Sequence, residues 1–383
     1  MSPERAILIA VATNKTSGRW SVEESINELA QLAKTAGAKV IGRLTQRLPV
    51  PSKTHYLGKG KLEELLELKD STNYNIAIFD DELSPLQQRN LEEVLKVKVI
   101  DRAALILDIF SRRAHTHEGK LQVELAQSEY LLPRLAGQWS HLERLGGGIG
   151  TRGPGESQLE TDRRLVRQKI HALKGRIEGV RKHRMLYRQK RKKSAIPIVA
   201  VVGYTNTGKS TLLNTLSRAD VLVEDKLFAT LDPTTRRIRL PNKSIVLLSD
   251  TVGFIRKLPP TIVSAFRATI EELGEASVLL HVVDLVSHNA AEQCQIVEEI
   301  LEDLNLKDKP RITALNKVDL LLDNAKTWGE EEAINYLSPQ TGETSQNTVL
   351  ISATKGWGLV KLLEVIGQVL AETTQTVFPG KRA

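Results

Sequence analysis

The chain has 383 residues, of which 41% are hydrophobic and 26% are charged, and its net charge is +8. This length predicts two or three domains, and the composition excludes a chain that is disordered throughout. No apolar run approaches the roughly 18 residues that cross a bilayer, and Cys294 is the single cysteine. We therefore expect no stable membrane insertion, no disulfide framework and a cytoplasmic location.

The positive charge is concentrated in one short stretch. Residues 1–162 carry a net charge of −1, residues 163–193 a net charge of +13, and residues 194–383 a net charge of −4. Lysine and arginine follow one another in that stretch with Glu178 as the single acidic residue. The sequence thus predicts a near-neutral protein that carries one basic rod.

The first block, residues 1–110, alternates short apolar runs with amphipathic stretches. We expect strands at 6–12, 38–44, 76–79 and 97–100, with helices at 21–36, 57–69 and 85–96 between them. Ser21 and Glu24 form a capping-box pattern at the start of the first helix. This alternation predicts a small parallel α/β domain.

The second block, residues 111–194, has apolar residues spaced as in two helices that pack along one seam. The first stripe runs from Leu121 to Leu142, with a kink expected at Pro133, and the second lies in a basic helix over 159–193. The glycine-rich segment 146–156 joins them, so we expect an antiparallel helix pair with a glycine-rich tip.

The third block, residues 195–375, begins with a strand at 196–202 and continues with strand and helix patterns, followed by a tail at 376–383. Two further strands, 236–240 and 245–249, flank a turn and predict a β-hairpin. The pattern is that of a second α/β domain.

Residues 203–210, Gly-Tyr-Thr-Asn-Thr-Gly-Lys-Ser, match the P-loop pattern between a predicted strand and a predicted helix. Glycines at this turn let backbone N–H groups surround a phosphate chain at a helix N-terminus. We expect Lys209 to reach the β- and γ-phosphates and the Ser210 hydroxyl to bind Mg²⁺.

The base is predicted from residues 316–319, Asn-Lys-Val-Asp, which follow a predicted strand. A carboxylate at Asp319 can accept from the two donors of guanine, whereas adenine would leave it unpaired. Lys317 would lie along the base and Asn316 would tie this loop to the P-loop, with Ser352 and Ala353 behind the base. The sequence therefore predicts GTP and GDP as ligands.

Two segments between the P-loop and the base loop are expected to sense the γ-phosphate. Asp250 would hold Mg²⁺ through water, the Gly253 N–H would meet the γ-phosphate, and Thr230 would complete the metal's coordination. Lys209, Thr230 and Gly253 are the expected catalytic groups, and Ser210, Thr230 and Asp250 are the expected metal ligands. The remaining predicted nucleotide contacts are Gly203, Tyr204, Thr205, Asn206, Thr207, Gly208, Thr211, Phe228 and Ala229.

These motifs, together with the linker 146–164 and its Glu-Ser-Gln-Leu-Glu continuation at 156–160, closely resemble the HflX family of translation-factor-class GTPases. The resemblance covers nearly the whole chain. It implies a C-terminal P-loop GTPase domain of the Ras-like class and GTP hydrolysis. It also implies binding to the large ribosomal subunit and its rRNA, with dissociation or rescue of ribosomes under stress. We expect a monomer.

The position after Gly253, where many GTPases have the glutamine that orients the attacking water, is Phe254. This substitution predicts slow intrinsic turnover that a partner stimulates. Asn206 stands where related GTPases use a potassium ion near the phosphates, and the alternative is that it only caps the loop.

The rod at 163–193 repels itself and favours a polyanion, with rRNA as the expected partner and a membrane surface or a solvated face as alternatives. The glycines at 148, 150 and 153 also match a dinucleotide fingerprint, but a helix precedes them, so we expect an RNA-contacting tip or a hinge. His115, His117 and Glu118 lack the spacing of a metal site.

Two other functional classes remain open from the sequence. One is an ATP- or GTP-driven RNA-remodelling or ribosome-assembly factor, and the other is a regulatory GTPase that acts through protein or membrane partners. The base loop argues against ATP at the P-loop, while a second nucleotide site within residues 1–110 stays open.

Overall fold

The structure is a computed structural model. It describes residues 4–13, 20–135, 154–192, 196–217, 227–228, 230–232, 234–259, 262, 273–323, 326–341 and 346–377. The chain forms two compact units, which are described separately: unit 1 comprises residues 1–183 and 257–265, and unit 2 comprises residues 184–256 and 266–383.

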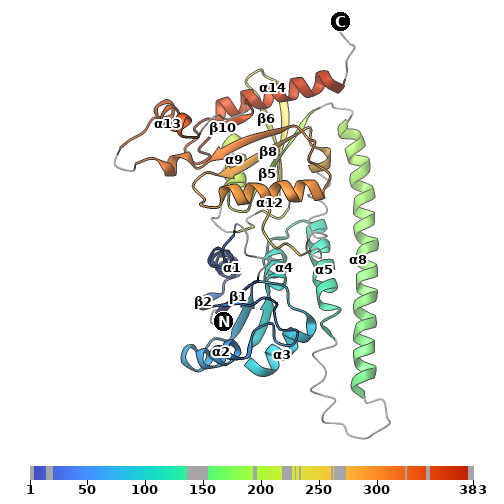
Figure 1. Cartoon of the computed structure of the whole chain (residues 1–383). Coiled ribbons are helices and arrows are strands. Elements are labelled where there is room, and N and C mark those ends of the chain that lie inside the picture. Colours follow the sequence, from blue (N-terminus) through green and yellow to red (C-terminus); the bar gives the residue numbers. More distant parts are fainter. Residues whose placement is uncertain are drawn as a thin grey trace. The chain divides into compact units, whose positions relative to one another are not determined.

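Unit 1 is built on a four-stranded parallel sheet in the order β2-β1-β3-β4 (Figure 1). Its strands are short and apolar, and the buried positions of β1 alternate between two helical layers. One face carries a core that includes Ile7, Ile9 and Phe79 beneath α2 and α3. The described elements of this sheet and its helices are β1 (Arg5–Ala12), α1 (Val22–Thr35), β2 (Lys39–Arg47), α2 (Lys59–Thr72), β3 (Ile76–Phe79), α3 (Pro85–Leu95), β4 (Lys98–Asp101) and α4 (Arg102–Arg113).

Helix boundaries in unit 1 follow local chemistry. The Ser21 side chain accepts from the Glu24 N–H at 3.1 Å and the Glu24 carboxylate accepts from the Ser21 N–H, which confirms the predicted capping box. Helix α2 starts two residues later than predicted because Tyr56, with φ of +65°, belongs to the preceding turn. Helix α4 is absent from the sequence prediction, which ended the first block near residue 110; the Asp101 side chain caps it.

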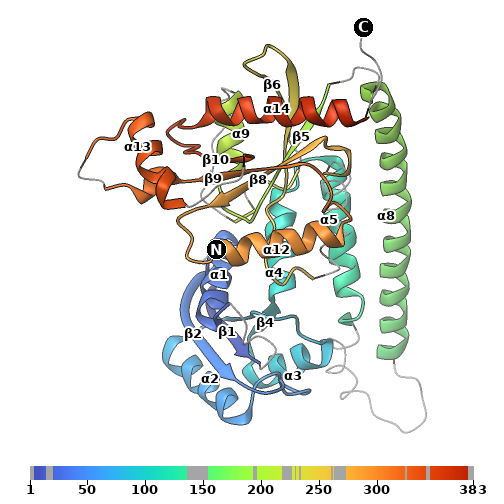
Figure 2. The same ribbon diagram turned by 45° about the horizontal axis from the view of Figure 1, so that its top comes forward.

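The helix pair consists of α5 (His117–Leu131) and α8 (Pro154–Lys192), which run antiparallel side by side (Figures 1 and 2). Leu121 and Leu125 of α5 pack with Leu173 of α8, as the two predicted stripes require. Helix α5 ends at Leu131, just before Pro133, although Leu132 still has helical backbone angles. Proline has no N–H to donate to a helical hydrogen bond, so the regular helix does not continue through it.

Helix α8 begins at Pro154, inside the segment 146–156 that was predicted to be an irregular turn. Proline suits the first helical position because its φ is already fixed and its missing N–H is not needed there. The rest of the predicted glycine-rich tip, including the glycines at 148, 150 and 153, lies outside the described residues.

Unit 2 has a six-stranded sheet in the order β10-β9-β8-β5-β7-β6. All neighbouring pairs are parallel except β6 and β7, which form the predicted antiparallel hairpin. Apolar side chains fill both faces, with α9 and α14 over one and α12 over the other (Figure 2). Its described elements are β5 (Ile198–Val202), α9 (Lys209–Ser217), β6 (Thr234–Arg239), β7 (Ile245–Asp250), β8 (Val278–Asp284), α12 (Ala290–Asp303), β9 (Arg311–Asn316), η2 (Val318–Leu321), α13 (Glu330–Leu337), η3 (Ser338–Thr341), β10 (Thr348–Leu350) and α14 (Leu359–Val377).

Each sheet ends in two edge strands, which pair on one side only among the residues that the structure describes. In unit 1 the nine-residue strand β2 is such an edge, and in unit 2 the strand β6 is another. None of the helices in the described part of the chain combines the length and the apolar character that a bilayer crossing requires.

Candidate functional site

The predicted P-loop connects β5 to α9, at the carboxyl end of the parallel strands of unit 2. Two of its positions accept only glycine. Gly203 has a φ of +151°, and a Cβ there would lie 2.3 Å from the Val282 carbonyl oxygen. Gly208 has a φ of +95°, and a Cβ there would lie 2.3 Å from Asn316 Nδ2. The turn is therefore closely packed at both glycines, as is typical of a loop whose backbone N–H groups surround a phosphate.

Lys209 is the first residue of α9 and is buried. Its ammonium group donates to the Gly203 oxygen at 3.1 Å and to the Tyr204 oxygen at 2.6 Å. Burial lowers the pKa of Lys209 to about 8, and the carboxylate of Asp250 opposes this shift. The hydrogen-bond partners of this buried ammonium group are neutral carbonyl oxygens, which favours an anionic ligand at the loop.

The three predicted metal ligands meet at one point. Ser210 Oγ lies 2.7 Å from both the Asp250 carboxylate and Thr230 Oγ1, and the Thr230 hydroxyl donates to Asp250 at 2.9 Å. Burial raises the pKa of Asp250, while its bond from Ser210 and the charge of Lys209 lower it. Oxygen donors of this kind suit Mg²⁺, which keeps several waters and takes few protein ligands. Two of these three oxygen donors are hydroxyls. In the described ranges, no cluster of three or more His, Cys, Asp or Glu side chains is arranged to hold a metal.

The segment after Asp250 lies directly on the P-loop. A Cβ at Gly253 would come within 2.7 Å of Thr205 Cα and 3.0 Å of Lys209 Nζ, so this position is also confined to glycine. Phe254 is half-buried and packs against an apolar cluster that includes Val202 and Leu279. Its ring therefore has neither the polar atom nor the direction needed to orient a water molecule.

The predicted base loop is tied to the P-loop through Asn316. The Asn316 amide donates to the Thr207 oxygen at 2.8 Å and accepts from the Ala353 N–H at 3.0 Å. This side chain brings three segments far apart in the sequence to one place. Lys317 has a φ of +68° and its ammonium group lies 2.7 Å from the Asp284 carboxylate.

Asp319 is half-buried in η2. Ser352, in the loop after β10, is fully buried, and its hydroxyl accepts from the Lys355 N–H at 3.0 Å. Thr211 is half-buried in the first turn of α9. Asn206 has a φ of +63°, in the left-handed region that asparagine tolerates better than most residues.

Phe228 is buried with a φ of +56°, and its N–H donates to the Thr205 hydroxyl at 3.2 Å. Ala229, another predicted nucleotide contact, lies outside the described residues. Two further predicted P-loop contacts use their side chains within this site. The Thr207 hydroxyl donates to the Tyr204 oxygen at 3.0 Å, and the Tyr204 hydroxyl accepts from the Arg256 N–H at 3.0 Å.

Two contributors to this site were absent from the sequence prediction. Asp284 ends β8 and pairs with Lys317, and its position at a strand's carboxyl end was the available signal. Thr215 donates to the Ala353 oxygen at 2.8 Å and so ties α9 to the loop behind the base. No motif marks Thr215, because its role depends on a contact across more than a hundred residues of chain.

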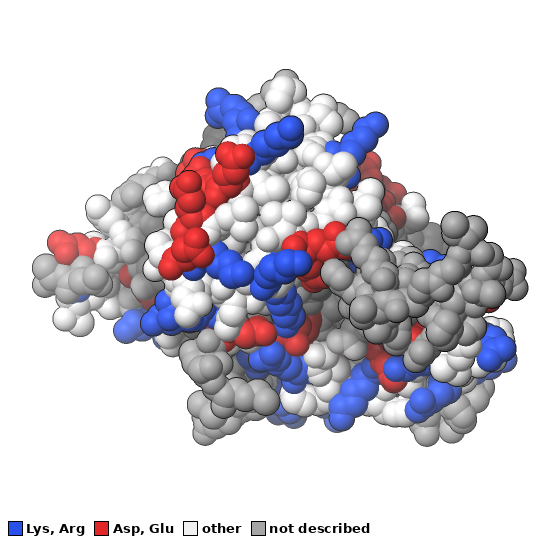
Figure 3. Space-filling model, turned by 90° about the horizontal axis from the view of Figure 1, so that it is seen from below, with Lys and Arg blue, Asp and Glu red and all other residues white. Residues whose placement is uncertain are grey.

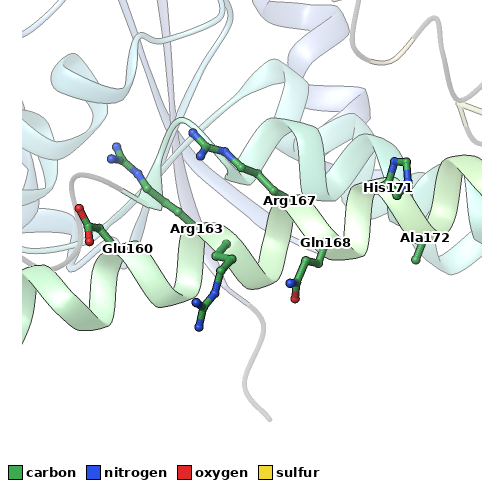
Figure 4. Close-up of a pocket in the computed structure, with 7 residues that line it drawn as sticks. Glu160, Arg163, Arg167, Gln168, His171 and Ala172 are labelled. Atoms are coloured by element: carbon green, nitrogen blue, oxygen red, sulfur yellow. The ribbon is translucent and has the colours of Figure 1, made fainter.

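The exposed face of α8 forms a second candidate surface. Arg163, Arg164, Arg167 and His171 line an open cleft on this helix together with Glu160, Gln168 and Ala172 (Figure 4). Between residues 163 and 182 the acidic side chain is Glu178 alone. On the face of the molecule in Figure 3, by contrast, Lys and Arg are interspersed with Asp and Glu.

The exposed side of α8 carries small residues as well as basic ones. Ala172, Gly175 and Gly179 are exposed there, and a Cβ at either glycine would meet nothing within 4 Å. The flanking exposed residues are long cations, while Lys169 and Lys174 are held by Glu124 and Glu129 of α5 at 2.8 Å. The exposed cations of the outer side and its flanks are Arg164, Arg167, Arg176, Arg181 and Lys182.

Comparisons with known proteins find similarity in both units. Residues 23–111 match a family model described as GTP-binding GTPase N-terminal, residues 113–191 one described as GTP-binding GTPase Middle Region, and residues 198–317 one described as 50S ribosome-binding GTPase. Together these models match most of the chain.

Curated relatives named GTPase HflX align over nearly the full length. The protein from Caldanaerobacter subterraneus is 50% identical, with 99% of this chain and 84% of that protein covered. The one from Escherichia coli is 44% identical, with 91% and 79% covered. Among solved structures, a GTP-binding protein from Sulfolobus solfataricus in complex with GDP aligns at 25% identity and a TM-score of 0.47, with 96% of this chain and 99% of that chain covered. The chain belongs to the HflX family of GTPases: it binds guanine nucleotide and hydrolyses GTP.

Proposed function

We propose that this GTPase binds the large ribosomal subunit through rRNA, and that it couples GTP binding and hydrolysis to the dissociation or rescue of ribosomes under stress. It would act in the cytoplasm as a monomer. The observation that carries the proposal is the exposed face of α8, where cations stand without carboxylates between them from Arg163 to Arg176. The match of residues 198–317 to a family described as 50S ribosome-binding GTPase supports the choice of ribosomal RNA.

The shape of α8 favours RNA as the partner rather than a partner with a flat surface. Small residues at 172, 175 and 179 let the helix backbone approach a ligand closely, and Arg167 and Arg176 flank that line on either side. A phosphate chain fits such a basic track because its charges are evenly spaced and accessible. A-form RNA is recognised largely through phosphates, 2′-hydroxyls and shape, for which interleaved aromatic residues are unnecessary.

The nucleotide cycle that we propose uses the groups of unit 2. Ser210 and Thr230 would bind Mg²⁺ directly and Asp250 through water, and the metal would neutralise charge that develops on the phosphates. Lys209 would pair with the β- and γ-phosphates, and the Gly253 N–H would contact the γ-phosphate. Their mutual distances of 2.7–2.9 Å support the assignment of the three oxygen groups to one ion.

Co-sedimentation with purified ribosomal subunits tests the proposal. The chain should pellet with the large subunit when a non-hydrolysable GTP analogue is present and much less with GDP. Binding should weaken steeply between about 50 and about 300 mM salt, because each phosphate contact releases counterions. Equal binding in both nucleotide states, or binding that is insensitive to salt, would contradict it.

A matched pair of triple variants assigns the contact to α8. Replacing Arg164, Arg167 and Lys182 by glutamine should weaken binding at least tenfold and flatten its salt dependence. The control carries the same loss of charge at three exposed lysines of unit 2, Lys307, Lys326 and Lys361. The control should bind like the parent chain, and equal losses in both variants would point to net charge instead of a surface on α8.

A further inference from the structure

Residues 234–249, which form most of the β6–β7 hairpin and which we call the basic hairpin, carry a local excess of positive charge. This segment contains no Asp or Glu, and its four cations are Arg236, Arg237, Arg239 and Lys243. The rest of residues 194–383 contains 15 basic and 23 acidic residues, a net charge of −8. The basic hairpin therefore stands out from an otherwise acidic part of the chain.

The cations of the basic hairpin have no carboxylate partners. Arg237, Arg239 and Lys243 are exposed and Arg236 is half-buried, and within the described part of the chain none of the four forms an ion pair. Three exposed lysines elsewhere in unit 2 are each paired with a glutamate, namely Lys307, Lys326 and Lys361. Like charges that are close together and uncompensated favour an anionic partner.

The free edge of β6 adds hydrogen-bonding groups to this charge. Strand β6 is the last of its sheet, with β7 as its neighbour (Figure 2). The Leu240 N–H donates to the Ser244 oxygen at 2.9 Å, and bonded pairs alternate along an antiparallel ladder. Leu247, which faces Arg237 in the register, donates on its other side, to the residue before β5, at 2.9 Å. The backbone N–H and C=O groups of Arg237 and Arg239 therefore point to the free edge.

This combination of groups fits RNA better than a lipid surface. Three of the four cations are arginines, whose planar guanidinium groups bind phosphate oxygens in pairs. RNA also offers 2′-hydroxyls, which donate and accept, to the N–H and C=O groups of a strand edge. A bilayer-binding surface needs apolar side chains to enter the membrane, and none of the large exposed apolar residues in the described part of the chain lies in the basic hairpin.

We propose that the basic hairpin is a second RNA-binding surface, separate from α8, which contacts the phosphate backbone of rRNA in the large ribosomal subunit. The choice of this RNA rests on the proposed function. Arg237 and Arg239 project from one face of β6 and Arg236 from the other, because side chains alternate along a strand. Cations thus reach a phosphate chain at the free edge from both sides. The match to a family described as 50S ribosome-binding GTPase covers residues 198–317, which include the basic hairpin.

The test measures the Kd of the full chain for purified large subunits, with a non-hydrolysable GTP analogue, between about 50 and about 300 mM salt. The triple variant Arg237→Gln, Arg239→Gln and Lys243→Gln should raise Kd about fivefold or more. It should also lower the slope of log Kd against log salt by about 2, because each phosphate contact contributes about 0.7–0.9. Replacing both arginines by lysine keeps the charge and should keep the slope. An unchanged Kd or slope in the glutamine variant would overturn the proposal.

Two controls show that any loss belongs to the basic hairpin. The variant with glutamine at the three paired lysines of unit 2, Lys307, Lys326 and Lys361, loses the same charge and should bind like the parent chain. The hairpin variant should hydrolyse GTP at the parent rate without ribosomes, which shows that unit 2 is folded. An equal loss of binding in the control would assign the effect to net charge and refute the surface.

Two other probes separate RNA from other anionic partners. The hairpin variant should lose affinity for protein-free large-subunit rRNA by a similar factor, and a loss confined to intact subunits would identify an acidic protein and refute RNA. Flotation with phosphatidylglycerol vesicles that depends on the hairpin would also refute it. If the α8 variant binds like the parent while the hairpin variant does not, the α8 contact is wrong and the hairpin stands. The reverse result overturns the hairpin alone.

Discussion

Lys209 is the single side chain whose acid–base behaviour most directly affects the reaction. Its pKa is lowered to about 8 because burial disfavours the ammonium form, although Asp250 acts in the opposite direction. Phosphates stabilise the ammonium form, so nucleotide binding raises this pKa and takes up a proton when the pH exceeds about 8. The binding affinity for GTP should therefore fall as the pH rises through 8, by up to about tenfold per pH unit.

Titration calorimetry at about pH 8.5 in two buffers of different ionisation enthalpy measures this proton uptake. A fraction of a proton should enter on binding at this pH, and close to none should be traced to Lys209 at about pH 7. Identical binding enthalpies in both buffers at the higher pH would show that Lys209 stays charged in the free protein.

Asn206 provides a second prediction at the scale of one residue. Its backbone is left-handed, with φ of +63°, in the turn that surrounds the phosphate-binding point. If its side chain helps to hold a potassium ion there, hydrolysis should be faster in KCl than in NaCl, and Asn206→Ala should abolish that difference. A variant whose rate falls equally in both salts would indicate a loop cap instead.

At the scale of elements, the sequence predicted what depends on local order. The four strands of unit 1, the capping box at Ser21 and the hairpin of β6 and β7 all follow from periodicity and short-range chemistry. Helix α4 was missed because Asp101, its cap, directly ends a strand and leaves no loop between the two elements. The pairing of Glu28, Asp80 and Arg102 could not be predicted, since three distant positions meet through the tertiary fold alone.

The buried ion pairs of Arg102 give a prediction about the stability of unit 1. The Arg102 side chain is 2% exposed and that of Asp80 is 1% exposed. Arg102→Met leaves two buried carboxylates without their guanidinium and should lower the free energy of unfolding by about 3–5 kcal/mol. Arg89→Met, which breaks an exposed pair with Glu93, should cost about 0–1 kcal/mol. Hydrogen exchange of peptides from β3 and α4 measures both, and equal protection in the two variants would contradict the prediction.

For the molecule as a whole, Phe254 determines how hydrolysis must be completed. Its ring packs into the apolar layer beside α12, so this chain lacks the usual glutamine that positions water. Intrinsic turnover should be slow, and ribosomes should raise kcat strongly by ordering the segments around Thr230 and Gly253. Single-turnover hydrolysis with and without saturating ribosomes measures this stimulation. A rate that ribosomes leave unchanged would mean that the chain completes its own catalytic site.

The edge strands β2 and β6 have a consequence for the protein at high concentration and during synthesis. A free strand edge can pair with the same edge of another copy and begin aggregation. Lysine and arginine recur along both strands, at Lys39, Arg43 and Arg47 in β2 and at Arg236, Arg237 and Arg239 in β6. When the same edge strand of two copies approaches in register, these positive charges repel each other. Lysine and arginine, through which we propose that α8 binds a polyanion, should thus also keep copies of this chain apart at these edges.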